Sequence, residues 1–513
     1  AVYRLEWRMQ DAGAVPACRS FSGSRHSPAV VLLADSTGFG RRVEEAAVSV
    51  DARIVVTASP GNSLAFETTT TTTTVAAGSP DRACCTTPTA RRLARVRVSE
   101  VGDFVKLLDD ARGLCGGDCC LGAVLQLWPL DLQKSGGSTS DQPAAGEPRS
   151  AAADGLEATG AVAGTLHAVQ ALALAAAGGR GGGGACQWPR LCIVTRGAQE
   201  CGGSQRAAPS PAQAAVVGLA RVVEAELPEL DCVCVDLDPD ADGASGAEAE
   251  ALLLEALWRR ASSPPPPPPP PEGGDGCGRQ RQPREQLVCM RASENRRFVA
   301  RLNRWDQPPP TEVAERMQRQ QQLDSGVRAA TAAGAEGAPL VSRAGAYVVT
   351  GGLGGLGTAF CRWLAKGGAG RVVLVGRKEP TAAAREAAEQ VARETGTTVA
   401  FARADVAEAG ELGSAVSREQ TNGGGLALLG VIHCAGVTYP APIARQAIPM
   451  FAYTFASKVR GAWNLHELDV AAVAAAESAV AATTGTAAAA AAAAATAKGR
   501  IFVVSSSIAG LLG

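Results

Sequence analysis

Short apolar runs alternate with helix-like segments in the second half of the chain. An apolar run at Tyr347–Val349 leads into a glycine-rich turn, which is followed by a helix-like segment at Thr358–Lys366 and a second apolar run at Val372–Val375. Short apolar runs bounded by turn residues are typical of buried strands. The pattern therefore predicts a strand, a turn, a helix and a parallel strand.

The same alternation continues towards residue 513. We expect further strands at Val399–Ala404, Leu426–His433 and Arg500–Ser505, and a helix at Phe451–Leu468. The first half shows a similar order, with a helical pattern at Ala212–Leu227 and apolar runs at Ala29–Ala34, Arg53–Thr57, Ala123–Trp128, Leu191–Thr195 and Asp231–Asp236. Buried strands that alternate with helices favour parallel sheets covered on both faces. We predict an α/β fold with two tandem Rossmann-like, doubly wound parallel sheets.

Low-complexity segments interrupt this pattern. Composition favours flexible or extended insertions there, and the segments concerned are Thr68–Thr74, Gly178–Gly184, Pro264–Pro271 and Val470–Lys498. An Arg- and Gln-rich segment, Glu312–Val327, is expected to be a helical or flexible linker. We therefore divide the chain into a first subdomain at residues 1–310, a linker at 311–342 and a second subdomain at 343–513.

Charge and hydropathy exclude several classes of partner. The chain has 513 residues and a formal net charge of -1, so nothing indicates nucleic acid or an anionic membrane. No stretch is long and apolar enough for a transmembrane span, because the alanine tract Ala487–Ala495 is too weakly hydrophobic. The chain starts without Met and without a signal peptide, and we expect it to be part of a longer protein. The compartment stays open, with the cytoplasm favoured.

The chain contains 15 cysteines but only four scattered histidines. The closely spaced cysteines, among them Cys84-Cys85 and Cys119-Cys120, have no partner CxxC pair or histidine cluster. We therefore predict no metal site and reduced thiols, several of which serve as small core residues.

The glycine-rich turn carries the first chemical signal. A pyrophosphate fits such a turn because glycines let the backbone approach it at the positive end of the following helix. The expected cofactor-binding residues here are Thr350, Gly351, Gly352, Leu353, Gly354, Gly355, Leu356 and Gly357. The comparable turn of the first half, Asp35–Gly40, has only two glycines, so we predict a structural role for it.

Arg377 suggests which dinucleotide the turn binds. It lies 20 residues beyond Gly357, where an NAD site usually offers Asp or Glu to the ribose hydroxyls. A basic residue suits a 2′-phosphate instead, so we predict NADPH. The alternative is that Arg377 and Lys378 are a solvated strand end.

Two later strand ends are consistent with a dinucleotide. Asp405 and Val406 follow the third strand and are expected to meet the adenine. Cys434, Ala435 and Gly436 follow the fourth strand, and their small side chains would let the backbone pass the cofactor ribose. In order, and behind the glycine turn, these signals reinforce one another.

The residue order resembles the short-chain dehydrogenase/reductase superfamily and, more narrowly, the ketoreductase domain of type I polyketide synthases and fatty acid synthases. In the second half the resemblance rests on TGGLGGLG, VVLVGR, ADV, VIHCAGV, KVRGAWNLHEL and SSSIAGLLG, which begins at Ser505. Landmarks in the first half, such as YRLEW, LQLWPLD and FVARL, resemble the family's structural, non-catalytic subdomain. The resemblance covers nearly the whole chain apart from the low-complexity segments.

The resemblance implies NADPH-dependent reduction of a β-ketoacyl thioester to the β-hydroxyacyl form. The substrate would be carried on an acyl carrier protein through phosphopantetheine, with other synthase domains in cis as further partners. In the family a Tyr donates the proton, a Ser hydrogen-bonds the substrate carbonyl, and a Lys lowers the pKa of the Tyr. Lys458 and Ser507 match the Lys and the Ser, with Ser506 as the alternative for the latter.

The catalytic Tyr has no counterpart among the four tyrosines, since the family places it about a dozen residues beyond the Ser. Tyr453 lies five residues before Lys458, which turns the two side chains about 140° apart on a helix. Tyr439 could line the substrate entrance, but nothing makes it an acid. We therefore expect a C-terminally truncated ketoreductase fragment that is inactive alone. The alternative is a catalytically inactive cofactor-binding or scaffold module.

Overall fold

Two separate β-sheets organise the chain in the computed structural model. The structure describes residues 2–11, 28–50, 52–71, 89–115, 121–136, 151–178, 188–201, 209–241, 246–262, 287–291, 296–305, 340–482 and 500–505. Within these residues a ten-stranded sheet is built from strands before residue 306, and a five-stranded sheet from strands after residue 344.

The first sheet is parallel in its centre and antiparallel at its edges. Its strands lie in the order β1-β10-β9-β8-β7-β6-β2-β3-β5-β4, with β1 paired antiparallel to β10 and β4 paired antiparallel to β5. The bounds are β1 Val2–Asp11, β2 Ala29–Leu33, β3 Arg53–Pro60, β4 Ala65–Thr71, β5 Thr89–Val96, β6 Leu121–Gln126, β7 Arg190–Arg196, β8 Val233–Leu237, β9 Leu287–Arg291 and β10 Arg296–Trp305. The central strands are entirely buried, as parallel strands covered on both faces must be.

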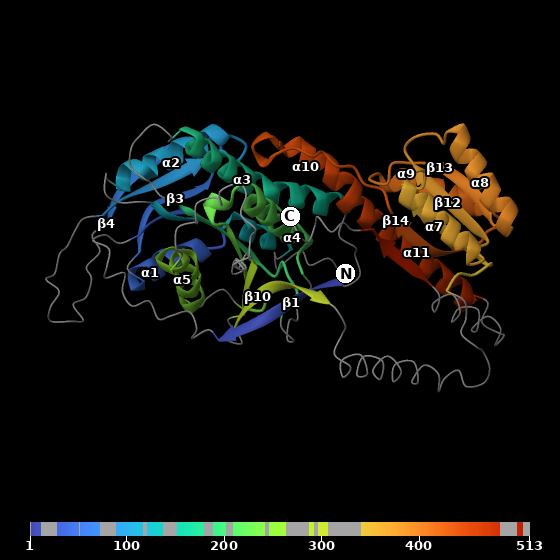
Figure 1. Ribbon diagram of the computed structural model, residues 1–513, viewed down its shortest axis with the longest axis horizontal. Helices are drawn as coiled ribbons and strands as arrows, with labels where there is room; N and C mark the ends of the chain where they lie inside the picture. Colours follow the sequence, from blue (N-terminus) through green and yellow to red (C-terminus); the bar gives the residue numbers. More distant parts are fainter. Residues whose placement is uncertain are drawn as a thin grey trace, which may run out of the picture.

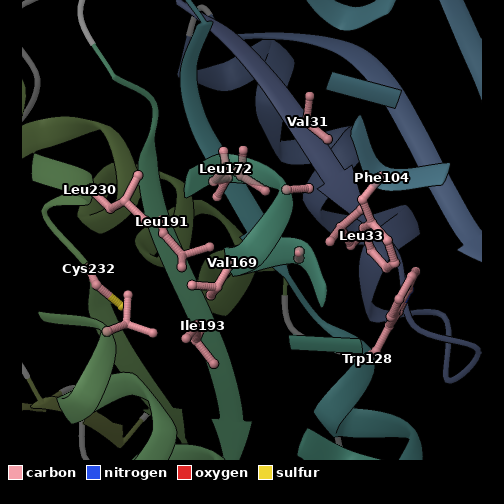
Figure 2. Packing of buried hydrophobic residues seen from close by; sticks show 14 of the residues in the cluster. Val31, Leu33, Phe104, Trp128, Val169, Leu172, Leu191, Ile193, Leu230 and Cys232 are labelled. Atoms are coloured by element: carbon pink, nitrogen blue, oxygen red, sulfur yellow. The ribbon is translucent and has the colours of Figure 1, made fainter. Parts of the chain in front are cut away.

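Helices cover both faces of this sheet (Figure 1). On one face α1 (Phe39–Ser49) and α5 (Gly246–Ser262) pack against Val30, Leu32 and their neighbours. On the other face lie α2 (Val101–Cys115), α3 (Ala151–Gly178) and α4 (Pro211–Glu226). Figure 2 shows part of this second core, where Leu172 and Val169 of α3 lie over Leu191 and Ile193 of β7.

The second sheet is parallel throughout, in the order β13-β12-β11-β14-β15. Its strands are β11 Gly345–Thr350, β12 Arg371–Gly376, β13 Thr398–Arg403, β14 Ala427–His433 and β15 Ile501–Val504. Cys361 and Leu364 of α7 (Gly355–Lys366) pack on one face, and α8 (Ala382–Thr395) contacts β13. On the other face lie α9 (Ala409–Asn422) and α11 (Gly461–Ala482). The carboxyl ends of the strands therefore meet at one edge, beside the start of α7.

These sheets confirm the predicted α/β fold with tandem Rossmann-like sheets, and each predicted strand is present. Thr68–Thr71 belong to β4 and so take the extended form of the two that the prediction left open, because β-branched threonines suit a strand. Two details of the prediction are wrong. Residues 470–482 extend α11, because alanine has the highest helix propensity. The antiparallel edges of the first sheet were not foreseen. The predicted linker Glu312–Val327, the polyproline stretch and residues 179–184 lie outside the described residues.

The predicted helix Phe451–Leu468 is divided into three parts. It comprises α10 (Ile448–Phe455), a π-helical turn η7 (Ala456–Arg460) and α11. Single π turns inside helices occur frequently at functional sites, and this one contains Lys458. No helix among the described residues combines the length and the apolar character that a membrane crossing needs.

The two halves touch through α3 and α10, which lie side by side in Figure 1. Ile448, Phe451 and Phe455 of α10 pack against the core of the first half. The amide of Gln170 on α3 donates to the carbonyl oxygens of Ile443 and Gln446, at 3.0 and 2.8 Å. The first half therefore holds the segment that leads from β14 to Lys458.

Candidate functional site

The glycine turn between β11 and α7 has room only for glycine at several positions. Gly351 has a φ of +65°, and a Cβ there would lie 2.7 Å from the Cys434 carbonyl oxygen. A Cβ on Gly357 would lie 2.5 Å from the Gly351 carbonyl oxygen. The turn is therefore folded tightly onto itself and onto the end of β14.

The amino terminus of α7, in contrast, is open. Its N-cap residue is Gly354, which makes no side-chain cap, and no acidic residue lies in the first turn. A Cβ on Gly355 would meet no atom within 4 Å. Uncapped backbone N–H groups at a helix start carry partial positive charge and attract an anion. This cradle fits the pyrophosphate of a dinucleotide.

The corresponding place in the first half is filled by the chain itself. The Asp35 carboxylate accepts hydrogen bonds from the backbone N–H groups of Gly40 and Phe39 at the start of α1, at 2.6 and 3.2 Å. It also accepts from the N–H and the hydroxyl of Thr37. A carboxylate therefore sits where a phosphate would bind. This contrast gives a physical basis for the structural role predicted for the Asp35–Gly40 turn.

Arg377 directly follows β12, at the same sheet edge as the glycine turn. Its Nη1 donates to the Tyr453 hydroxyl oxygen at 3.0 Å and lies 3.9 Å from Asp405 Oδ2. The hydrogen bond to Tyr453 and the nearby acidic groups raise the pKa of Arg377. The side chain is half-exposed, which leaves it accessible to a ligand. Of the predicted adenine residues, Asp405 lies beside Arg377, whereas the Val406 side chain is buried in the core beneath α11.

A chain of hydrogen bonds runs behind the strand ends. Thr350 Oγ1 lies 2.7 Å from His433 Nδ1, and His433 Nε2 lies 3.1 Å from the Ser457 carbonyl oxygen. The carbonyl can only accept, so Nε2 carries the proton, and Nδ1 accepts from the Thr350 hydroxyl. Burial lowers the pKa of His433, which keeps the ring neutral and preserves this direction. The Thr350 side chain, completely buried, thus faces the core rather than a ligand.

His433 fixes the backbone immediately before Lys458. Ser457, whose carbonyl oxygen accepts this hydrogen bond, lies in the π turn η7. The Ser457 hydroxyl oxygen also accepts a hydrogen bond from the Val437 N–H, at 3.4 Å. The side chain of Lys458 is exposed and extends past Gly436, whose Cβ position would lie 3.4 Å from Lys458 Cε. The structure therefore brings Lys458 to the loop after β14, beside Cys434, Ala435 and Gly436.

The structure assembles most of the predicted site residues at one edge, but not all. Ser506 and Ser507 lie outside the described residues, which end at Ser505 directly after β15. Cys434 Sγ lies 3.3 Å from the hydroxyl of that Ser505. Among the described residues no group of His, Cys, Asp or Glu side chains could hold a metal ion.

Sequence reasoning missed the parts played by His433, Ser457 and Tyr453. From the sequence, His433 has no expected role beyond ending the predicted strand Leu426–His433, and Tyr453 is considered only as a proton donor. One signal was available for His433. Thr350 follows the first predicted strand and His433 ends the fourth, two strands that are neighbours in a Rossmann-like sheet, and the two residues are register partners in the structure.

Comparison with known proteins adds family matches to this geometry. Residues 345–499 match the KR domain, and residues 114–261 match the Rossmann fold domain of the polyketide synthase extender module SpnB. The chain is 30% identical over 279 residues to a protein of the phenolphthiocerol/phthiocerol polyketide synthase of Mycobacterium tuberculosis (strain CDC 1551 / Oshkosh), covering 54% of this chain and 12% of that protein. It is 39% identical over 123 residues to the phthioceranic/hydroxyphthioceranic acid synthase of Mycobacterium bovis (strain BCG / Pasteur 1173P2), covering 24% of this chain and 6% of that one. The chain thus spans a small part of the length of these relatives.

Solved structures show the same fold at low identity. The first ketoreductase of the tylosin polyketide synthase matches with a TM-score of 0.55 and 20% identity, covering 100% of this chain and 74% of that one. A-type ketoreductases from a modular polyketide synthase match with a TM-score of 0.54 and 20% identity, covering 91% and 71%. The family matches and the tandem sheets lead to one conclusion: the chain contains a ketoreductase domain of the type I polyketide synthase family.

Proposed function

We propose that this chain is the NADPH-dependent ketoreductase module of a polyketide or fatty acid synthase, reducing a β-ketoacyl thioester on an acyl carrier protein to the β-hydroxyacyl form. One juxtaposition carries the proposal. The uncapped start of α7, the Arg377 guanidinium and the Lys458 side chain lie along the same carboxyl edge of the second sheet. Parallel α/β sheets bind ligands at that edge.

The residues divide into a binding set and a reacting set. The α7 start would hold the pyrophosphate and Arg377 the 2′-phosphate. Bound NADPH supplies the hydride. The Lys458 ammonium would touch the cofactor ribose and stabilise negative charge on the proton donor, and Ser507 would hydrogen-bond the substrate carbonyl. Lys458 suits this role because the π turn holds its backbone while its side chain stays exposed beside Gly436.

The partners and the division of the chain are also proposals. An acyl carrier protein would present the acyl chain on phosphopantetheine, and further synthase domains would lie in cis, as the multidomain relatives suggest. We propose residues 1–310 as a structural subdomain, 311–342 as a linker and 343–513 as the catalytic subdomain. The internal carboxylate at α1 supports the structural role of the first part.

For residues 1–513 taken by themselves, a specific observation favours a second candidate, a cofactor-binding module without turnover. The Tyr453 hydroxyl oxygen accepts a hydrogen bond from Arg377. Tyr347 is completely buried, and its hydroxyl oxygen accepts a hydrogen bond from the Ser342 N–H. Tyr3 lies in β1 of the other sheet. Tyr439 packs its ring against Tyr453. None of these four tyrosines has the position expected of the proton donor.

Two measurements on residues 1–513 separate the candidates. NADPH binding is followed by the fluorescence of the reduced nicotinamide, and turnover by NADPH consumption with a β-ketoacyl thioester. We expect saturable binding without reduction. Measurable reduction that Lys458→Ala abolishes would support an active enzyme and contradict our exclusion of Tyr453. Lys366→Ala, at the far end of α7, is the matched control. Absence of any NADPH binding would contradict both candidates.

A further inference from the structure

A cluster of four side chains lies beside the glycine turn and comes from four different elements. We define the adenosine-side cluster as Arg377 after β12, Asp405 after β13, Tyr439 in the loop after β14 and Tyr453 on α10. Its members are joined by one hydrogen bond, one cation–π contact, one aromatic contact and one longer ion pair. A cluster of this kind at a ligand-binding edge calls for a chemical explanation.

Tyr453 fixes the direction of the Arg377 guanidinium. Arg377 Nη1 donates to the Tyr453 hydroxyl oxygen at 3.0 Å, and the guanidinium carbon lies 5.6 Å from the centre of the same ring. The Tyr439 ring meets the Tyr453 ring edge-on, with the ring centres 5.4 Å apart. Tyr439 is itself held through its carbonyl oxygen, which accepts from Gln446 Nε2 at 3.2 Å. The geometry is therefore set before any ligand arrives.

The direction of the hydrogen bond between Arg377 and Tyr453 determines what the Tyr453 hydroxyl can still donate. Arginine has only donors, so the phenol oxygen must be the acceptor and its own O–H proton points elsewhere. Tyr453 is 40% exposed, so this proton faces solvent or a ligand. The guanidinium keeps its remaining N–H groups. Together the pair offers a convergent set of donors with positive charge, which is what a phosphate dianion needs.

Asp405 affects how strongly the adenosine-side cluster can bind a phosphate. Its Oδ2 lies 3.9 Å from Arg377 Nη1 and its Oδ1 accepts the Ala407 N–H at 3.0 Å. A nearby carboxylate repels a phosphate, so a single guanidinium would be partly neutralised there. A second, uncharged donor adds binding without adding another charge that Asp405 could neutralise.

We propose that Tyr453 is a specificity-determining residue for the cofactor, donating its hydroxyl proton to the adenosine 2′-phosphate that Arg377 also binds. This inference rests on the proposed function and deepens it. The ligand class is a 2′-phosphorylated adenine dinucleotide. Tyr453 thus has a binding task that is separate from proton transfer to the substrate.

The test compares affinities for phosphorylated and unphosphorylated ligands with residues 1–513. NADPH and NADH are titrated by fluorescence, and adenosine 2′,5′-bisphosphate and 5′-AMP by calorimetry. Tyr453→Phe removes only the hydroxyl and keeps the ring under Arg377. We expect it to weaken NADPH and the bisphosphate about 3- to 10-fold, as loss of one hydrogen bond at a partly exposed site does. NADH and 5′-AMP should bind as they do to the wild type.

Two arginine variants complete the experiment. Arg377→Ala should weaken the 2′-phosphorylated ligands more than Tyr453→Phe does. Arg393→Ala, which removes an exposed arginine paired with Glu389 on α8, should change nothing. Equal or tighter binding of NADPH by Tyr453→Phe would overturn the inference, as would an equal loss for NADPH and NADH.

The bisphosphate separates this inference from the proposed function. If the wild type prefers the bisphosphate over 5′-AMP and that preference falls about 3- to 10-fold in Tyr453→Phe, the inference stands even when NADPH itself does not bind, and only the proposed function fails. If the wild type binds NADPH but shows no preference between bisphosphate and 5′-AMP, the inference fails and the dinucleotide site remains.

Discussion

The Thr350 hydroxyl lies 2.7 Å from His433 Nδ1, at the point where two adjacent parallel strands end. The other ring nitrogen of His433 binds the Ser457 carbonyl oxygen at 3.1 Å. The ring is 3% exposed. One neutral histidine therefore ties together the strand before the glycine turn, the strand before the Cys434–Gly436 loop and the π turn that contains Lys458.

This arrangement predicts a pH-dependent stability. Burial lowers the pKa of His433 in the folded state, whereas the unfolded chain has the ordinary value of about 6.5. As the pH falls below that value, the unfolded state takes up a proton first, and stability is lost. We expect the melting temperature to fall between pH 7.5 and pH 5.5, and to fall less in His433→Gln, which cannot be protonated.

Calorimetry or circular dichroism at a series of pH values measures this difference. His466→Gln, on the exposed surface of α11, serves as the control and should keep the pH dependence of the wild type. Parallel curves for the wild type and His433→Gln would show that His433 does not titrate on unfolding.

The glycine turn predicts that two neighbouring alanine substitutions behave differently. Gly357→Ala places a Cβ 2.5 Å from the Gly351 carbonyl oxygen, so it should destabilise the fold by about 1–3 kcal/mol. Gly355→Ala meets no atom within 4 Å and should leave the melting temperature unchanged or slightly higher. It should nevertheless weaken NADPH about tenfold or more, since its methyl group occupies the space where the phosphates would lie.

Thermal unfolding and NADPH titration of both variants test this distinction. Unchanged NADPH affinity in Gly355→Ala would show that the pyrophosphate does not pass over the α7 start. An unchanged melting temperature in Gly357→Ala would show that the turn can relax.

The sequence predicts the strands well because each is a short apolar run between turn residues, as at Val372–Val375. It predicts Lys458 and the glycine turn by motif. Contacts that depend on register and helix geometry are not accessible in this way. Arg377 and Tyr453 lie 76 positions apart, and the hydrogen bond between them depends on the position of α10, which docks against α3. Composition also misled at residues 470–482, where tertiary packing and alanine propensity give a helix instead of a loose insertion.

The internal carboxylate of the first half predicts a local stability effect. Asp35→Ala removes the acceptor for two backbone N–H groups at the start of α1 and for Thr37. We expect a loss of about 1–3 kcal/mol, the usual result of leaving such donors without a partner. Denaturant unfolding without nucleotide measures it. Asp109→Ala, whose carboxylate is exposed beside Arg112, should cost far less. Similar losses in both variants would contradict the role of Asp35 as the internal anion.

The contact between the two halves predicts that α3 controls the order of the segment before Lys458. Gln170, which is 8% exposed, donates to the carbonyl oxygens of Ile443 and Gln446, and the Ile443 N–H donates to Glu226 Oε2 at 2.7 Å. Gln170→Leu removes one donor from each carbonyl oxygen, although that of Ile443 still accepts from the Gln446 N–H at 3.3 Å. We therefore expect a loss of about 1–3 kcal/mol and faster amide exchange over residues 439–451. Hydrogen–deuterium exchange with mass spectrometry measures the second effect. Glu226→Gln keeps an acceptor oxygen for Ile443 and should exchange like the wild type. If Gln170→Leu also exchanged like the wild type, the first half would not be what holds this segment, and its effect on Lys458 would have to run through the apolar face of α10 alone.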